Sequence, residues 1–211
     1  MFTTTLSQTA QEALALLGNS HILDLGYLAG GSALALHYGH RYSYDFDFFT
    51  ENEFDEKQIV KQLYSIGSFT PTTIEHKTIL GTFCGIKFSY FYYDYPLIAP
   101  TTDYLGIHLS HPHDVAAMKL VAMMDRGTKR DFIDLYQLVQ QGLSLEIMLD
   151  LYEKKYGTLA SNQFSLIKSV GYFDDAEDDE MPKMIFPVTW DRVKTFFTSE
   201  SIRLGKKFLM N

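Results

Sequence analysis

The stretch from Gly30 to Phe49, G-G-S-A-L-A-L-H-Y-G-H-R-Y-S-Y-D-F-D-F-F, constrains the fold of this chain more than any other part of it. The glycine pair permits a sharp turn, and the apolar residues after it predict a short helix over 32–38. Aspartate then alternates with aromatic residues, which predicts a strand over 44–49. Together with a short strand expected over 27–29, the stretch predicts two strands joined through a helix.

The predicted strand 44–49 carries two carboxylates on one face. Alternation sends Asp45 and Asp47 to one side of the strand, and Tyr44, Phe46 and Phe48 to the other. The aromatic side can pack on a core, while two neighbouring carboxylates repel each other unless a cation lies between them. Hard divalent cations such as Mg²⁺, or Mn²⁺, bind oxygen ligands of this kind and often share them with phosphates. The strand therefore predicts a metal site.

The glycine turn offers a complementary anion site. Gly30 and Gly31 allow close backbone approach, and the amides at a helix start attract phosphate, with the Ser32 hydroxyl as a further donor. Arg41 follows the same helix and could either contact a triphosphate or hold one of the two aspartates in place. A phosphate site next to metal-binding carboxylates indicates nucleotide chemistry.

These residues carry a family resemblance. A Gly-Gly-Ser turn followed by Asp-x-Asp on a strand looks like the motif of polymerase-beta-type nucleotidyltransferases, and the full string is similar to the AbiEii/AbiGii toxin family. Two later blocks agree with this: D-V-A-A-M-K-L at Asp114–Leu120 and K-R-D-F-I-D-L-Y at Lys129–Tyr136. The resemblance covers roughly residues 20–140. It implies an α+β fold, with a nucleotidyltransferase-type mixed sheet and flanking helices followed by a helical C-terminal half.

The activity that the resemblance implies is metal-dependent transfer of a nucleotide from an NTP to a hydroxyl acceptor. It further implies the toxin component of a toxin–antitoxin or phage-defence system, with the tRNA 3′ end as the first acceptor to test and an antitoxin protein as a partner. Two alternatives stay open: a weakened member that binds nucleotide or a partner without turnover, and an enzyme that modifies small molecules such as antibiotics.

The later blocks supply further candidate residues. Lys119 is the only charge in V-A-A-M-K-L-V-A-M-M and either reaches the surface with its amine or, as the resemblance favours, neutralises phosphate charge in the nucleotide site. Asp131 is a catalytic candidate by resemblance, as a general base or as an orienter of Lys119, although an aspartate there also suits a helix start. Asp134 is expected to be structural, and Arg130 could meet phosphate or pair with a neighbouring acid.

One feature departs from the fullest form of the family motif. A third carboxylate is usual on a later strand, but the matching stretch, G-I-K-F-S-Y-F-Y-Y-D, places Ser89 there and Asp94 at the strand end. This departure is the reason for the weakened-binder alternative.

Composition limits the other function classes. The net charge of −8 argues against a protein that grips nucleic acid nonspecifically, and the acidic run 174–180 is expected to be a solvated loop. No apolar run approaches the roughly 20 residues that span a bilayer. Cys84 is the single cysteine, and a cytoplasmic location is expected. The 30 Tyr and Phe residues alternate within predicted strands, which indicates core packing and not a base-stacking surface.

The pattern changes near residue 110, which predicts an α/β domain over 1–110 and a helical domain over 111–211. Further helices are expected over 6–17, 57–66, 113–126, 129–141, 145–156, 161–170 and 190–197, and further strands over 72–78, 82–93 and 104–109.

Overall fold

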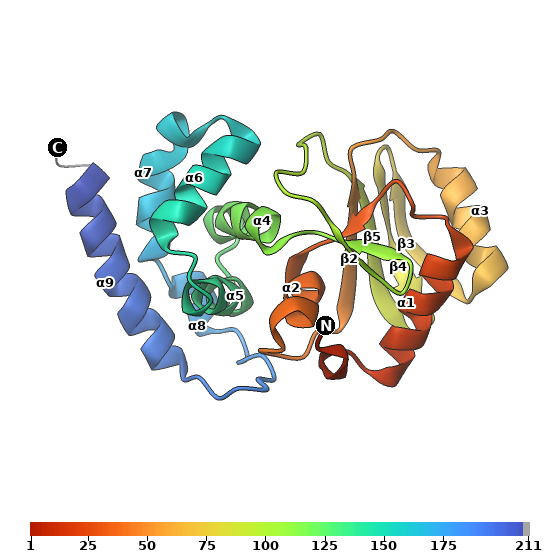
Figure 1. Cartoon of the computed structure of the whole chain (residues 1–211), viewed down its shortest axis with the longest axis horizontal. Coiled ribbons are helices and arrows are strands. Elements are labelled where there is room, and N and C mark those ends of the chain that lie inside the picture. The colour runs from red at the N-terminus through yellow and green to blue at the C-terminus, as the bar shows by residue number, and fades with distance from the viewer. Residues whose placement is uncertain (209–211) are drawn as a thin grey trace. The chain divides into compact units, whose positions relative to one another are not determined.

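The structure is a computed structural model that describes residues 1–208 and divides into two compact units, Met1–His111 and Pro112–Asn211 (Figure 1). The first contains the helices η1 (Thr3–Thr5), α1 (Gln8–Ser20), α2 (Gly30–Tyr38) and α3 (Glu56–Ile66), and the strands β1 (Tyr27–Leu28), β2 (Asp45–Thr50), β3 (Phe69–Glu75), β4 (Thr78–Phe83), β5 (Ile86–Tyr92), β6 (Thr102–Tyr104) and β7 (Ile107–Leu109).

The strands of the described residues form one mixed sheet of seven, in the order β3-β4-β5-β2-β1-β7-β6. β2 runs parallel to β5 and β1 runs parallel to β7, whereas the remaining neighbours are antiparallel. This is the mixed sheet with flanking helices that the sequence predicts.

One face of the sheet is the core of the first unit. Phe46 and Phe48 on β2 and Phe88 on β5 are fully buried on this face, and α1 and α3 lie on one side of the sheet (Figure 1). Both helices begin at residues that cap them, because Ser7 accepts a hydrogen bond from Ala10 N and Asp55 accepts one from Gln58 N. Removing this apolar surface from water is the main stabilising term for such a layer.

Several sequence-based boundaries were wrong. Tyr44 precedes β2 and is 60% exposed, so it does not join the buried aromatic face. The predicted strand 104–109 is a hairpin, β6–β7, that turns at Leu105 and Gly106, which both have positive φ. Gly18 does not end α1: a Cβ there would lie 1.9 Å from Leu105 O, so the glycine lets the hairpin pack on the helix.

The second unit is helical. Its helices are α4 (Pro112–Asp125), α5 (Lys129–Gln140), α6 (Leu145–Tyr156), α7 (Leu159–Val170), α8 (Asp174–Glu177) and α9 (Trp190–Phe208). Lys155 on α6 and Asp114 on α4 form an ion pair at 2.8 Å with both side chains fully buried, which joins these two helices. None of the helices in residues 1–208 is long and apolar enough to cross a membrane.

The acidic run 174–180 is more ordered than the sequence suggests. It contains α8, and Asp179 accepts a hydrogen bond from the first amide of α5, at Lys129 N, over 2.9 Å. The Lys129 amine in turn donates to Asp179 O at 2.6 Å. Although most of its acidic side chains are exposed, the run is packed on the N-terminus of α5.

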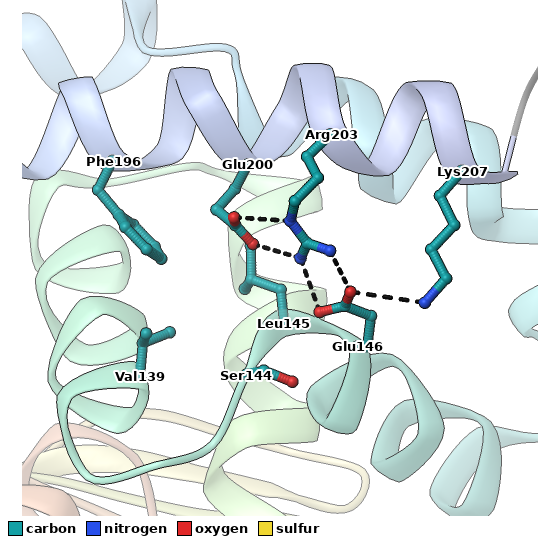
Figure 2. A pocket seen from close by; sticks show the side chains of 8 residues that line it. All are labelled: Val139, Ser144, Leu145, Glu146, Phe196, Glu200, Arg203 and Lys207. Atoms are coloured by element: carbon teal, nitrogen blue, oxygen red, sulfur yellow. Dashed lines mark hydrogen bonds and ion pairs between the residues drawn. The ribbon is translucent and has the colours of Figure 1, made fainter.

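The last helix, α9, extends past the predicted range 190–197 and is held by a cluster of charges (Figure 2). Arg203 forms hydrogen bonds with both carboxylate oxygens of Glu146 at the start of α6 and with Glu200 on its own helix. These charges border a cavity of about 560 Å³, whose other lining residues include Val139, Leu145 and Phe196. The cavity is thus bordered by ion pairs that Arg203 forms with Glu146 and Glu200.

Candidate active site

The glycine turn and the carboxylate strand lie against each other in the first unit. Gly30 is the first residue of α2 and has a backbone φ of +63°, a conformation that residues other than glycine rarely adopt. A Cβ at Gly30 would lie 3.4 Å from Asp47 Oδ2. Ala29 N, the residue before the turn, donates to Asp47 O at 2.9 Å. The fold thus places the start of a helix, where amides attract anions, beside one of the two aspartates.

Asp45 and Asp47 share one half-exposed face of β2, as the alternation predicts. In the parallel register with β5, Asp45 lies opposite Lys87 and Asp47 lies opposite Ser89. Ser43 Oγ donates to Asp45 Oδ1 at 3.3 Å. Two half-exposed carboxylates on one strand face fit a hard divalent cation that is shared with phosphate. Ser89, the residue opposite Asp47, is 5% exposed and carries a hydroxyl in place of a carboxylate.

The glycine turn and the start of β2 are stabilised by internal contacts of Ser32, Gly31 and Arg41. The Ser32 hydroxyl donates to the main-chain oxygen of Asp45, so it ties α2 to β2 instead of pointing a donor at a ligand. A Cβ at Gly31 would lie 2.2 Å from Arg41 Nη2, which shows that the guanidinium occupies the space that this glycine leaves. Arg41 is 4% exposed and also donates to Tyr42 O at 3.0 Å. The arginine is therefore packed against the glycine turn.

In the second unit, Lys119 is not a surface lysine. It is 6% exposed, and its amine contacts Asp131 Oδ1 at 2.9 Å and Asp134 Oδ2 at 2.7 Å. Both aspartates are fully buried on α5. A buried ammonium is stable when paired in this way. The structure thus brings together Lys119, Asp131 and Asp134, and makes Asp134 a partner equal to Asp131.

Asp131 has further donors around it. It forms a capping box with Thr128, whose hydroxyl donates at 2.6 Å, and Arg126 Nε donates at 3.0 Å. Burial raises the pKa of the Asp131 carboxyl, but the charge of Lys119 and the hydrogen bonds from Arg126 and Thr128 together hold that pKa well below its usual range. A carboxylate stabilised so strongly in its charged form is a poor proton acceptor. This environment suits an orienter of Lys119 better than a general base.

The candidate residues therefore fall into two groups. Gly30, Gly31, Ser32, Arg41, Asp45 and Asp47 are assembled around the turn of the first unit, whereas Lys119 and Asp131 are assembled in the second. Arg130 is exposed on the first turn of α5.

Several neighbours of these groups were not predicted from the sequence. The capping box could have been predicted from T-K-R-D at 128–131, because Thr followed three residues later by an acid is the sequence signature of this motif. Ser43 and Arg126 lie two and five residues from Asp45 and Asp131, in the segments before β2 and between α4 and α5, whereas strand register alone sets Lys87 opposite Asp45.

Comparison with known proteins identifies the family of this chain. The model of the family "Nucleotidyl transferase AbiEii toxin, Type IV TA system" matches residues 14–89 and 90–202. An uncharacterised protein of Aquifex aeolicus (strain VF5) is 39% identical over 98% of both chains.

Two solved structures share the fold. JHP933 from Helicobacter pylori has a TM-score of 0.57 and 19% identity over 97% of this chain and 95% of its own. MenT4, a nucleotidyltransferase toxin from Mycobacterium tuberculosis H37Rv, has a TM-score of 0.55 and 15% identity over 94% of this chain and 88% of its own. The chain described here belongs to the AbiEii family of nucleotidyltransferase toxins.

Proposed function

We propose that this nucleotidyltransferase binds an NTP with Mg²⁺ or Mn²⁺ at the glycine turn and the Asp45/Asp47 face, and transfers a nucleotide to a hydroxyl acceptor. The observation that carries the proposal is the 3.4 Å approach of the Gly30 Cβ position to Asp47 Oδ2, because it unites the anion site with the carboxylates. The chain's membership of a toxin family supports the role of a toxin, with an antitoxin protein as its partner in a cytoplasmic toxin–antitoxin or phage-defence pair. The tRNA 3′ end is the acceptor that we propose.

Each residue has a role in this proposal. The α2 amides that follow Gly30 bind the phosphates, and Ser32 holds Asp45 in place through its main-chain oxygen. Asp45 and Asp47 would hold the metal, which when bound supplies positive charge next to the phosphates and favours loss of the acceptor proton. Arg41, packed on Gly31, fixes the turn and contributes charge near the phosphates. For the second unit, we take from the family resemblance a role of Lys119 and Arg130 toward phosphate charge. Because the Lys119 amine is buried and paired with Asp131 and Asp134, we assign to Asp131 the role of orienting Lys119.

A second candidate function follows from Ser89. Because the position opposite Asp47 carries a hydroxyl and not a carboxylate, the site would have two acids where the fullest motif has three. A protein of this kind could bind nucleotide, or a partner, without turnover.

The third alternative is transfer of the nucleotide to a small molecule. The net charge of −8 suits a small acceptor better than it suits RNA, because RNA is itself negatively charged.

Transfer assays separate these functions. The purified protein is incubated with each labelled NTP, Mg²⁺ or Mn²⁺, and either total RNA or a panel of small hydroxyl compounds. Asp45→Asn and Asp47→Asn should abolish labelling of the acceptor, while Glu75→Gln, an exposed acid on β3 of the same sheet, should leave it unchanged. Labelled tRNA supports the proposal. Nucleotide binding without any labelled product supports the second candidate.

A further inference from the structure

The acidic run 174–180 holds both the backbone and the side chain of one lysine at the start of α5. Lys129, the first residue of α5, is only 7% exposed although it is charged. Its amide donates to Asp179 Oδ2 at 2.9 Å, and its amine donates to Asp179 O at 2.6 Å and to Glu177 O at 3.4 Å. The helix within the run, α8, lies next to α5 (Figure 1). One short segment therefore fixes Lys129 at two points.

These contacts compensate for an unfavourable placement of the lysine. The positive end of the helix dipole disfavours a cation in the first turn, and a buried ammonium costs free energy unless it is hydrogen-bonded or paired. The main-chain oxygens of the run bind the Lys129 amine, and the Trp190 ring lies 5.2 Å from it. Loss of these contacts would favour movement of the amine toward water, and with it movement of the first turn of α5.

The same turn carries Asp131. Its carboxylate accepts hydrogen bonds from the Thr128 hydroxyl at 2.6 Å and from the Thr128 amide at 3.3 Å, and it contacts the Lys119 amine at 2.9 Å. Lys129 lies between Thr128 and Asp131 in the chain, so a shift of its backbone changes the distance from Asp131 to Lys119. A misplacement of about 1 Å can slow an enzyme reaction by about a hundredfold.

We propose that Asp179 and Lys129 are positioning residues for nucleotide transfer, because they hold the first turn of α5 where Asp131 orients Lys119. This inference rests on the proposed function, in which Lys119 acts on phosphate charge. Asp179 and Lys129 act through Asp131 and need no contact with the substrates. The acidic run is then a support of the functional residues in the second unit.

The run also has a separate contact with α9, which provides an internal comparison. The Glu177 carboxylate accepts hydrogen bonds from Trp190 Nε1 at 3.2 Å and from Lys194 Nζ at 2.8 Å, and both donors belong to α9. Lys129 is bound by the main-chain oxygen of Glu177 and not by this carboxylate. Removing the carboxylate should therefore weaken the contact with α9 and leave the hydrogen bonds of Lys129 in place.

The test compares full-length variants in the transfer assay. Asp179→Ala removes the acceptor of the Lys129 amide, whereas Asp179→Asn keeps an oxygen there. Lys129→Met removes the donors of the amine and keeps the length of the side chain. Two controls remove a carboxylate of the same run: Glu177→Ala breaks the contact with α9, and Asp178→Ala removes an exposed acid. Both kcat and KM are measured well below the melting temperature of every variant. Hydrogen–deuterium exchange of residues 129–134 is measured without substrates.

The positioning role predicts a loss of kcat. Asp179→Ala and Lys129→Met should each lower kcat by about tenfold or more and leave the KM for NTP within about twofold, because the glycine turn and the carboxylate strand are unchanged. Exchange of residues 129–134 should be faster in both variants. Asp179→Asn should recover most of kcat. Glu177→Ala and Asp178→Ala should keep the kcat of the wild type, even though Glu177→Ala lowers the melting temperature.

Three results would overturn the positioning role: wild-type kcat in Asp179→Ala and Lys129→Met, an equal loss of kcat in Glu177→Ala, or no recovery in Asp179→Asn. A wild type that transfers nucleotide to no acceptor would instead overturn the proposed function. The exchange measurement needs no acceptor, so it still tests the hold of Asp179 on α5. Faster exchange in Asp179→Ala than in Glu177→Ala supports that hold, and equal exchange in the two variants excludes it.

Discussion

Asp131 illustrates how a single residue can serve stability and function together. Its carboxylate completes the capping box of α5 and pairs with Lys119, and no part of its side chain is exposed. Lys119 is held by Asp131 and Asp134 at once. Loss of one partner of a buried ion pair is costly, since a charge then remains in a medium that solvates it poorly.

We expect Asp131→Ala to lower the free energy of unfolding by about 3 kcal/mol, the lower end for a broken buried pair because Asp134 still holds Lys119. Urea unfolding at neutral pH measures it. Asp125→Asn, an exposed acid at the end of α4, should change stability by no more than about 0.5 kcal/mol. Asp131→Asn, which keeps the side-chain shape, is therefore the better variant for transfer assays. Equal stabilities of Asp131→Ala and Asp125→Asn would contradict this view of the cluster.

At the scale of elements, the Arg203 cluster links α9 to the start of α6 through an ion pair with Glu146. Figure 2 shows the guanidinium between Glu146 and Glu200, with Lys207 approaching Glu146 at 3.5 Å. The hydrogen bonds from Arg203 lower the pKa of Glu146 to about 2, although partial burial acts in the opposite direction. A carboxyl whose pKa is lower in the folded than in the unfolded state stabilises the fold above its unfolded pKa. That contribution is lost as the pH falls toward the folded value.

Glu146→Gln should therefore cost about 1 kcal/mol or less at pH 7, because the pair is partly exposed and screened. It should also flatten the loss of stability of the wild type between pH 4.5 and about 2, the window set by the two pKa values of Glu146. Urea midpoints measured across this pH range provide the comparison. Asp150→Asn, an exposed acid on the same helix, should keep the wild-type slope. A Glu146→Gln profile that parallels the wild type would exclude the cluster as a source of acid sensitivity.

At the scale of the whole molecule, the net charge of −8 means that a bound cation reduces the repulsion between negative charges and so stabilises the fold. A ligand that binds only the folded state raises stability through mass action, by about 2.7 kcal/mol at a hundred times its Kd. We expect an NTP with Mg²⁺ together to raise the melting temperature more than either alone, because the carboxylates and the phosphates each need the ion. Differential scanning fluorimetry at millimolar ligand is sufficient. Asp47→Asn should remove this shift without lowering the melting temperature of the free protein. A fall in that temperature would make Asp47 structural.

Much of the architecture could be predicted because local patterns govern it. The alternation in Asp45–Phe49 fixes which side chains share a face, and the buried Phe46 and Phe48 confirm it. The helical second half and the mixed sheet were also predicted correctly. Errors occurred where contacts between distant segments outweigh local preference. Gly18 reads as a helix end but makes room for the β6–β7 turn, and Ser32 reads as a phosphate donor but bonds to Asp45 O.

The sequence by itself therefore indicated the family, through the resemblance of its motifs, and the fold class, through local patterns, but it did not resolve the β3–β4 and β6–β7 hairpins. Tertiary structure alone decided the partners of the candidate residues. Strand register set Ser89 opposite Asp47 and Phe91 opposite Phe49. Helix packing gave Lys119 two carboxylates, Asp131 and Asp134, and gave Lys155 the carboxylate of Asp114. The physical reason is that burial and pairing, which set charge state and accessibility, depend on segments that lie far apart along the chain.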